Sequence, residues 1–112
     1  MALDFHDMQE MQKALQERYA GWWENIDPEH GKNKMLWMLA EIGEAIQVVK
    51  KHSEEEIMME GTVRHDLVEE LADAMMFFND ILLCYGISAE ELETVYRAKH
   101  KRNMTRWQKP DA

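Results

Sequence analysis

The chain has 112 residues, the size of a single domain, and 46% of them are apolar, which excludes a disordered acidic tail. Its formal net charge of −9 argues against binding to nucleic acid polymers or to an anionic membrane surface. Cys84 is the only cysteine, so no intrachain disulfide is possible and a reducing compartment is expected. No apolar run approaches the roughly 20 residues of a membrane span, and the first residues lack the pattern of a signal peptide. We therefore expect one soluble domain over residues 1–112, located in the cytoplasm.

The first half of the chain predicts two helices separated by a loop. Apolar residues recur at spacings of three and four over residues 5–19, with Asp4 as a candidate N-cap and Gly21 as a candidate stop. Residues 22–33, WWENIDPEHGKN, read as a loop, and a second helix is expected over about 32–51. The apolar residues expected to line one face of this second helix are Met35, Leu39, Ile42, Ile46 and Val49.

A third helix is the most apolar segment of the chain. After a short connection over 52–61, which can include a turn of helix, it is expected to start at Thr62, a candidate cap, and to run to about Tyr85, with Gly86 just past its end. Residues 71–83, LADAMMFFNDILL, are apolar almost all the way round, and such a helix must be covered on more than one side. We expect a second subunit to cover it; the alternative is an ordinary core helix with an uneven surface.

A fourth helix completes the expected architecture. Ser88 opens it with a capping-box pattern that Glu91 completes, and the helix runs to about Arg102 or Trp107. No segment alternates as a strand does. The prediction is an all-α fold of four helices, in which the second and third helices form a central helical hairpin.

Two pairs of acidic residues lie within the two helices of this hairpin. Glu41 and Glu44 are three residues apart, as are Glu70 and Asp73, and this spacing places each pair on one helical face. If the helices pack antiparallel, the pairs can face each other, and four carboxylates at that range would not all stay ionised unaided. A hard divalent cation such as Mg²⁺ would resolve the conflict. The alternative is that acids at this spacing belong to a solvated face, as they usually do.

Other classes of metal site fit the sequence less well. Ferritin-like di-iron bundles use Glu-x-x-His on two helices, and this pattern is absent from the chain. The five histidines show no paired ligand spacing, and one cysteine makes a structural zinc site improbable. Coordination by oxygen alone is the kind that remains.

The acidic motifs resemble those of a known family. E-I-G-E at 41–44 and E-L-A-D at 70–73 resemble the ExxE and ExxD motifs of the MazG-like, all-α nucleoside triphosphate pyrophosphohydrolases. K-H-K-R-N-M-T-R-W at 99–107 is similar to the Lys-x-x-x-Asn-x-x-Arg ending of MazG-like and dCTP pyrophosphatase-like members. The resemblance covers about residues 35–107. It implies a four-helix MazG-like bundle assembled into a homodimer or homotetramer.

The resemblance also implies an activity. Members of this family cleave a nucleoside triphosphate between its α and β phosphates, giving a monophosphate and pyrophosphate, with Mg²⁺ or with Mn²⁺ in its place. By position, Glu41, Glu44, Glu70 and Asp73 would hold the metal, and Glu41 or Glu44 would also orient or deprotonate the attacking water. The expected role is house-cleaning of non-standard or surplus (deoxy)nucleotides.

Further residues are candidates for substrate binding. Lys99, Asn103 and Arg106 fall at i, i+4 and i+7, on one helical face that could grip phosphates; the alternative is a basic helix end that complements its own dipole. For the base, the family resemblance suggests three aromatic residues, of which at most one of the two adjacent tryptophans is expected to stack. These residues are Trp22, Trp23 and Phe77.

Two alternative functions stay open. One is phosphoribosyl-ATP pyrophosphohydrolase, which shares the fold of the family. The other is a non-catalytic helical dimerisation module, which would account for the apolar third helix and the negative charge but not for the acidic pairs. The candidate substrates include dCTP, dUTP and damaged nucleotides.

Overall fold

The computed structural model describes residues 2–107, which form five α-helices and one short 3₁₀ turn. No strand occurs among these residues, so the all-α prediction is confirmed. The five helices differ from the expected four because one short helix lies in the segment predicted as a connection. The elements are α1 (Phe5–Arg18), η1 (Pro28–His30), α2 (Gly31–Lys51), α3 (Glu54–Met58), α4 (Thr62–Cys84) and α5 (Ala89–Arg106).

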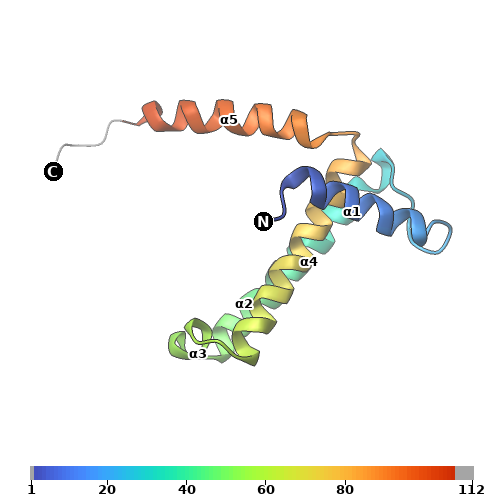
Figure 1. The fold of residues 1–112 in the computed structure, drawn as a ribbon. Coiled ribbons are helices and arrows are strands. Elements are labelled where there is room, and N and C mark those ends of the chain that lie inside the picture. Colours follow the sequence, from blue (N-terminus) through green and yellow to red (C-terminus); the bar gives the residue numbers. More distant parts are fainter. Residues whose placement is uncertain (1, 108–112) are drawn as a thin grey trace.

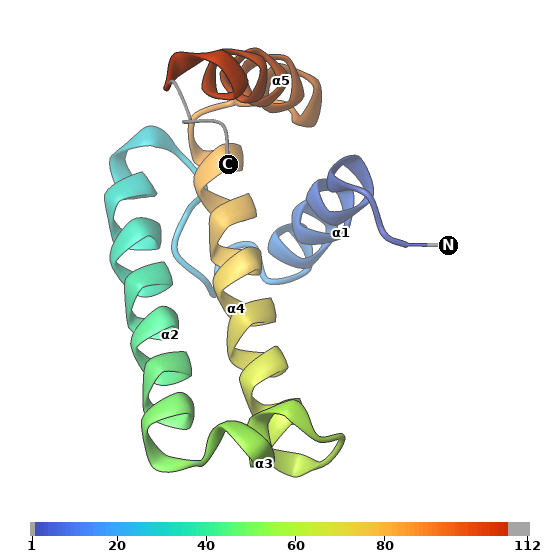
Figure 2. The same ribbon diagram turned by 90° about the vertical axis from the view of Figure 1, so that its left-hand side faces the viewer.

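Helices α2 and α4 form the predicted central hairpin. They lie side by side and run in opposite directions, joined at one end by α3 (Figure 2). α3 starts with a capping box in which the Ser53 hydroxyl accepts a hydrogen bond from the backbone N–H of Glu56, and the Glu56 carboxylate accepts one from the backbone N–H of Ser53. The prediction that Thr62 caps α4 is wrong, because the cap position is Gly61 and Thr62 is already the first helical residue.

Most helix ends follow the local signals in the sequence. Asp4 caps α1 by accepting a hydrogen bond of 2.8 Å from the backbone of Asp7. Gly86, just past α4, has a φ of +64°, a conformation that glycine adopts without strain. Ser88 caps α5 through the backbone of Glu91, at 3.1 Å. Gly86 and Ser88 lie in the short turn between α4 and α5, where the chain bends by 107°.

α1 crosses the second half of α4, and α5 leaves the hairpin. Phe5 and Phe78 meet edge to face at 5.9 Å between ring centres. Gln9 fastens α1 to the turn after α4, since its amide donates to the Ile87 carbonyl at 2.7 Å and accepts from the Ala89 backbone at 3.1 Å. Beyond this point α5 extends away from α2 and α4 (Figure 1). A single chain therefore does not close the expected four-helix bundle.

The apolar stripe of α2 faces outwards. The side of α2 that packs on α4 carries Lys34 and Ala45, which are buried, and Glu41, which is half-buried. Leu39 and Ile46, expected on the packed face, are 66% and 52% exposed. α4 likewise leaves several large apolar side chains open to solvent, and a surface of this kind commonly marks a site of protein association. The exposed residues of α4 are Val68, Leu71, Met75 and Met76.

Membrane-spanning potential is limited by helix length and composition. Within residues 2–107, no single helix is both long enough and apolar enough to cross a membrane. α4 and α5 reach that threshold only as a pair, with the 107° bend between them.

Candidate metal centre and adjoining cavity

The hairpin brings three carboxylates together. Glu41 and Glu44 project from α2, and Glu70 projects from α4; one oxygen of each lies within 4.8 Å of the others. The i, i+3 spacing aligns the two residues of α2, and antiparallel packing supplies the third from the facing helix. The predicted convergence of acidic residues across the hairpin therefore holds for these three.

Asp73 lies outside the three-carboxylate group. It is exposed, one turn along α4 from Glu70, and it lines the cavity beside the group. Its charge still reaches the cluster, because it contributes to raising the pKa of Glu41. Asp73 thus stands where the acidic cluster meets the cavity.

The carboxylates strongly perturb one another's protonation. Hydrogen bonding to Glu44, then to Glu41, together with burial, raises the pKa of Glu70 to about 7. Burial is the largest cause of the raised pKa of Glu41, and repulsion from Glu44 adds to it. Glu70 is therefore only about half ionised near neutral pH in the absence of a cation.

Two buried oxygens of the cluster lack partners. Glu41 Oε2 and Glu70 Oε2 are buried and accept no hydrogen bond from residues 2–107. An unpaired buried carboxylate oxygen is costly unless a cation or a proton satisfies it. Mg²⁺ prefers oxygen ligands and commonly joins one or two carboxylates to substrate phosphates. The donor set, three carboxylates with two unsatisfied oxygens, fits such an ion.

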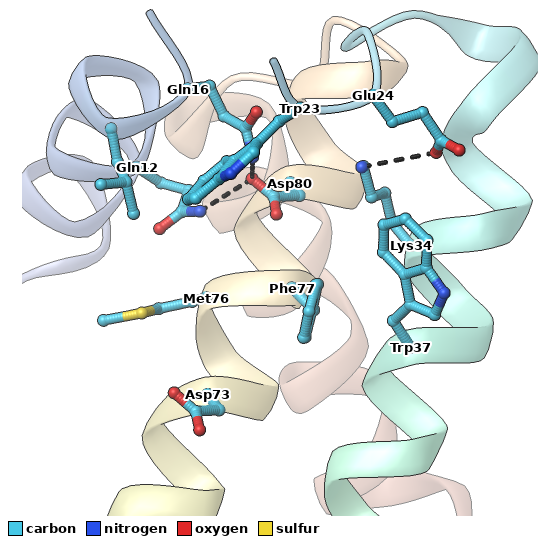
Figure 3. Close-up of a pocket in the computed structure, with 11 residues that line it drawn as sticks. Gln12, Gln16, Trp23, Glu24, Lys34, Trp37, Asp73, Met76, Phe77 and Asp80 are labelled. Carbon is cyan, nitrogen blue, oxygen red and sulfur yellow. Dashed lines mark hydrogen bonds and ion pairs between the residues drawn. The ribbon is translucent and has the colours of Figure 1, made fainter. Parts of the chain in front are cut away.

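A cavity of about 340 Å³ reaches Asp73, one helical turn along α4 from Glu70 of the cluster. Figure 3 shows the residues that line this cavity. It lies between α1, α2, α4 and the loop that precedes η1. Trp23, Trp37 and Phe77 line it, and Trp37 meets Phe77 edge to face at 5.9 Å. Asp73 lies at one end of the cavity and Asp80 at the other. Aromatic walls with polar groups at the ends are typical of small-molecule sites.

The candidate base-binding residues separate into two groups. Trp23 and Phe77 both line the cavity. Trp22 is 89% exposed and does not line it. Trp23 is held by stacking on Tyr19, at 4.4 Å between ring centres. The two adjacent tryptophans thus face different ways, as expected.

A buried polar network, which the apolar periodicity of the sequence does not predict, closes the far end of the cavity. Asp80 Oδ1 accepts hydrogen bonds of 2.9 Å from the side-chain amides of both Gln12 and Gln16. Lys34 Nζ lies 3.5 Å from Glu24 and 4.4 Å from the centre of the Trp37 ring. Burial raises the pKa of Asp80, while the two glutamine amides act in the opposite direction.

A signal for this network is present in the sequence. Gln9, Gln12 and Gln16 follow one another at spacings of three and four, and so form a polar stripe on one face of α1. Gln9 and Gln12 are the buried residues of α1, whereas Met11, one of the apolar residues that recur at helical spacing over 5–19, is exposed.

The basic residues of α5 lie apart from the acidic cluster. Lys99, Asn103 and Arg106 are exposed on the half of α5 that extends away from the hairpin (Figure 1). Within one chain they therefore do not reach the cluster or the cavity. The predicted phosphate site is not assembled by a single copy.

Comparison with protein-family models, with curated proteins and with solved structures gives no match for this chain.

Proposed function

We propose that this protein is a Mg²⁺-dependent nucleoside triphosphate pyrophosphohydrolase, which releases a (deoxy)nucleoside monophosphate and pyrophosphate. The observation that carries the proposal is the cluster of Glu41, Glu44 and Glu70, with two unsatisfied buried oxygens, next to an aromatic-lined cavity. The resemblance of the motifs at 41–44 and 70–73 to those of MazG-like enzymes supports the same activity.

The carboxylates take distinct roles in this proposal. Glu41, Glu44 and Glu70 hold the cation, with Asp73 as a further ligand on the cavity side. Mg²⁺, or Mn²⁺ in its place, would supply positive charge against the charge that develops on the phosphate oxygens. Glu41 or Glu44 orients the attacking water and accepts its proton. Glu41 suits this role because burial raises the pKa of its carboxyl.

A second copy of the chain completes the site in this proposal. The outward apolar faces of α2 and α4 provide the surface for a homodimer or homotetramer. α5, which its own hairpin does not hold, would carry Lys99, Asn103 and Arg106 to the phosphates bound by a neighbouring copy. The positive charges of Lys99 and Arg106 would offset the negative charge of the acidic cluster, which the net charge of −9 otherwise reinforces.

The biological role that fits is removal of non-standard or surplus nucleotides in the cytoplasm, where a free cysteine such as Cys84 stays reduced. The exposed apolar surface also favours a second candidate, a non-catalytic helical dimerisation module. The module gives no reason for the buried, unpaired oxygens of Glu41 and Glu70, and its stability would not respond to Mg²⁺.

The experiment that tests the proposal is pyrophosphate release from standard, deoxy and modified nucleoside triphosphates, with Mg²⁺ and with EDTA. Mg²⁺-dependent release with the monophosphate as co-product is the expected result. No release from any of them, by a folded oligomer, would overturn it. Phosphoribosyl-ATP belongs in the same panel, and release from it alone would identify the related enzyme of that specificity.

A further inference from the structure

The cavity extends from Asp73, one turn from the acidic cluster, along one face of α4. Asp73, Phe77 and Asp80 are spaced by four and three residues, so they share that face, and the seven residues from Asp73 to Asp80 rise by about 10.5 Å. This length is comparable with the reach from the first phosphate of a nucleotide to the far edge of its base. A nucleotide whose phosphates lie near Asp73 would therefore bring the far edge of its base to Asp80.

At this far end, the ionised carboxylate of Asp80 can only accept further hydrogen bonds. Its residue is 3% exposed, and its Oδ1 already accepts from the amides of Gln12 and Gln16. Oδ2 accepts no hydrogen bond from residues 2–107. It is also not completely buried, so a ligand in the cavity can reach it. Figure 3 shows this carboxylate above Phe77, at the inner end of the cavity. The group that meets it must be a hydrogen-bond donor.

Lys34 supplies hydrogen-bond donors, whereas Asp80 supplies an acceptor. The residue is 2% exposed. Its ammonium has three N–H donors, and the Glu24 carboxylate, at 3.5 Å, accepts a hydrogen bond from one of them. It lies over the Trp37 ring, in the wall of the cavity. A ligand edge that reaches both residues therefore needs a donor opposite Asp80 and an acceptor towards Lys34.

We infer that the cavity between Asp73 and Asp80 is a base-recognition subsite, selective for bases with an exocyclic amine where uracil and hypoxanthine carry a carbonyl. Cytosine and adenine have this pattern, a donor amine next to an acceptor ring nitrogen. A carbonyl at the same position would face the Asp80 carboxylate and leave two acceptors unpaired. Trp23, Trp37 and Phe77 supply the apolar and aromatic walls for either ring. The inference rests on the proposed function for the placement of the phosphates.

The test compares nucleotides that differ only in this group. Binding of dCMP against dUMP, and of dAMP against dIMP, is measured without metal by quenching of tryptophan fluorescence, because two tryptophans line the cavity. The amine-bearing member of each pair should bind between about ten-fold and a hundred-fold more tightly, the range expected for one unpaired buried polar group. Equal affinities within both pairs, or a preference for the carbonyl, would overturn the inference.

A substitution sharpens the test. In Asp80→Asn, Gln12 and Gln16 would still donate to the amide oxygen, so the amide N–H₂ would face the cavity. The variant should therefore reverse the preference within each pair, whereas a merely structural role would weaken both members equally. Asp66→Asn is the matched control, because Asp66 is exposed on the same helix, and it should leave the ratios unchanged. If Asp80→Asn does not fold, the wild-type ratios still decide the question.

The inference and the proposed function fail separately. Hydrolysis of dCTP and dUTP with equal kcat/KM, together with equal binding of dCMP and dUMP, would refute the base selectivity and keep the enzyme. Selective binding of dCMP without hydrolysis of any triphosphate would refute the enzyme and keep the subsite.

Discussion

Mg²⁺ and a proton should compete for the carboxylate cluster. The carboxyl of Glu70 has a pKa of about 7, and a carboxylate must lose its proton to bind the ion. With that pKa, about nine in ten Glu70 side chains are ionised at pH 8 and about one in ten at pH 6. Lowering the pH from 8 to 6 should therefore weaken the apparent affinity for Mg²⁺ roughly ten-fold.

Calorimetric titration of Mg²⁺ into the protein measures both parts of this prediction. Repeating the titration in buffers with different ionisation enthalpies gives the number of protons released. Nearly one proton per ion should be released at pH 6, and almost none at pH 8. Glu70→Gln should bind the ion more weakly and lose most of the pH dependence. Glu69→Gln, an exposed acid on the same helix, is the control and should behave as the wild type.

Three results would refute this reasoning. Mg²⁺ affinity that does not change between pH 6 and pH 8 would show that Glu70 carries no proton at the lower pH. Unchanged pH dependence in Glu70→Gln would place the titrating group elsewhere. Absence of Mg²⁺ binding at either pH would remove the metal assignment altogether.

Further predictions concern stability, catalysis, assembly and phosphate binding. Because the pKa of Glu70 is higher in the folded chain than its ordinary value of 4.5, its contribution to stability is complete below about pH 4.5 and is lost as the pH rises through about 7. Thermal melting in EDTA should show this loss, and Mg²⁺ at a hundred times its dissociation constant should add about 2.7 kcal/mol. Glu44→Gln should reduce pyrophosphate release to background with an unchanged circular dichroism spectrum. Leu39→Glu should weaken self-association by about a hundred-fold, measured by sedimentation, because an unpaired charge buried at an interface costs about 3 kcal/mol. Lys99→Ala and Arg106→Ala should weaken binding of triphosphates more than binding of monophosphates.

Each of these predictions has an opposing outcome. Stability in EDTA that rises between pH 5 and pH 8 would contradict the assignment of Glu70. Wild-type turnover in Glu44→Gln would remove the cluster from the chemistry. A wild-type chain that sediments as a monomer would contradict the role given to the outward face of α2, and equal losses of triphosphate and monophosphate in the Lys99 variant would move the phosphate site away from α5.

Local structure was largely predictable because its causes are local. Caps such as Asp4 and Ser88, and a stop such as Gly86, act within one turn of the helix end. The helical period alone places Glu41 beside Glu44, whatever the rest of the chain does. The hairpin also followed from the sequence, because two long helices joined by a short connection pack antiparallel.

The direction in which each helical face points was not predictable in this way. Periodicity shows that the apolar residues of α2 share a stripe, but not whether α4 or a second copy covers it. The structure turns Lys34 and Ala45 towards α4 and leaves Leu39 exposed. A stripe that will be buried in an assembly has the same pattern as one buried within the chain.

The sequence by itself determined the four longer helices, their main caps and the pairing of the acidic residues within each helix of the hairpin. Only the tertiary structure decided that Glu70 joins Glu41 and Glu44 while Asp73 borders the cavity, and that Gln12 meets Asp80 across 68 positions of the chain. It also decided that α5 turns away from the cluster. The physical reason is that the helical period relates residues within a few turns, whereas the crossing of α1 over α4 and the bend before α5 depend on how whole helices pack.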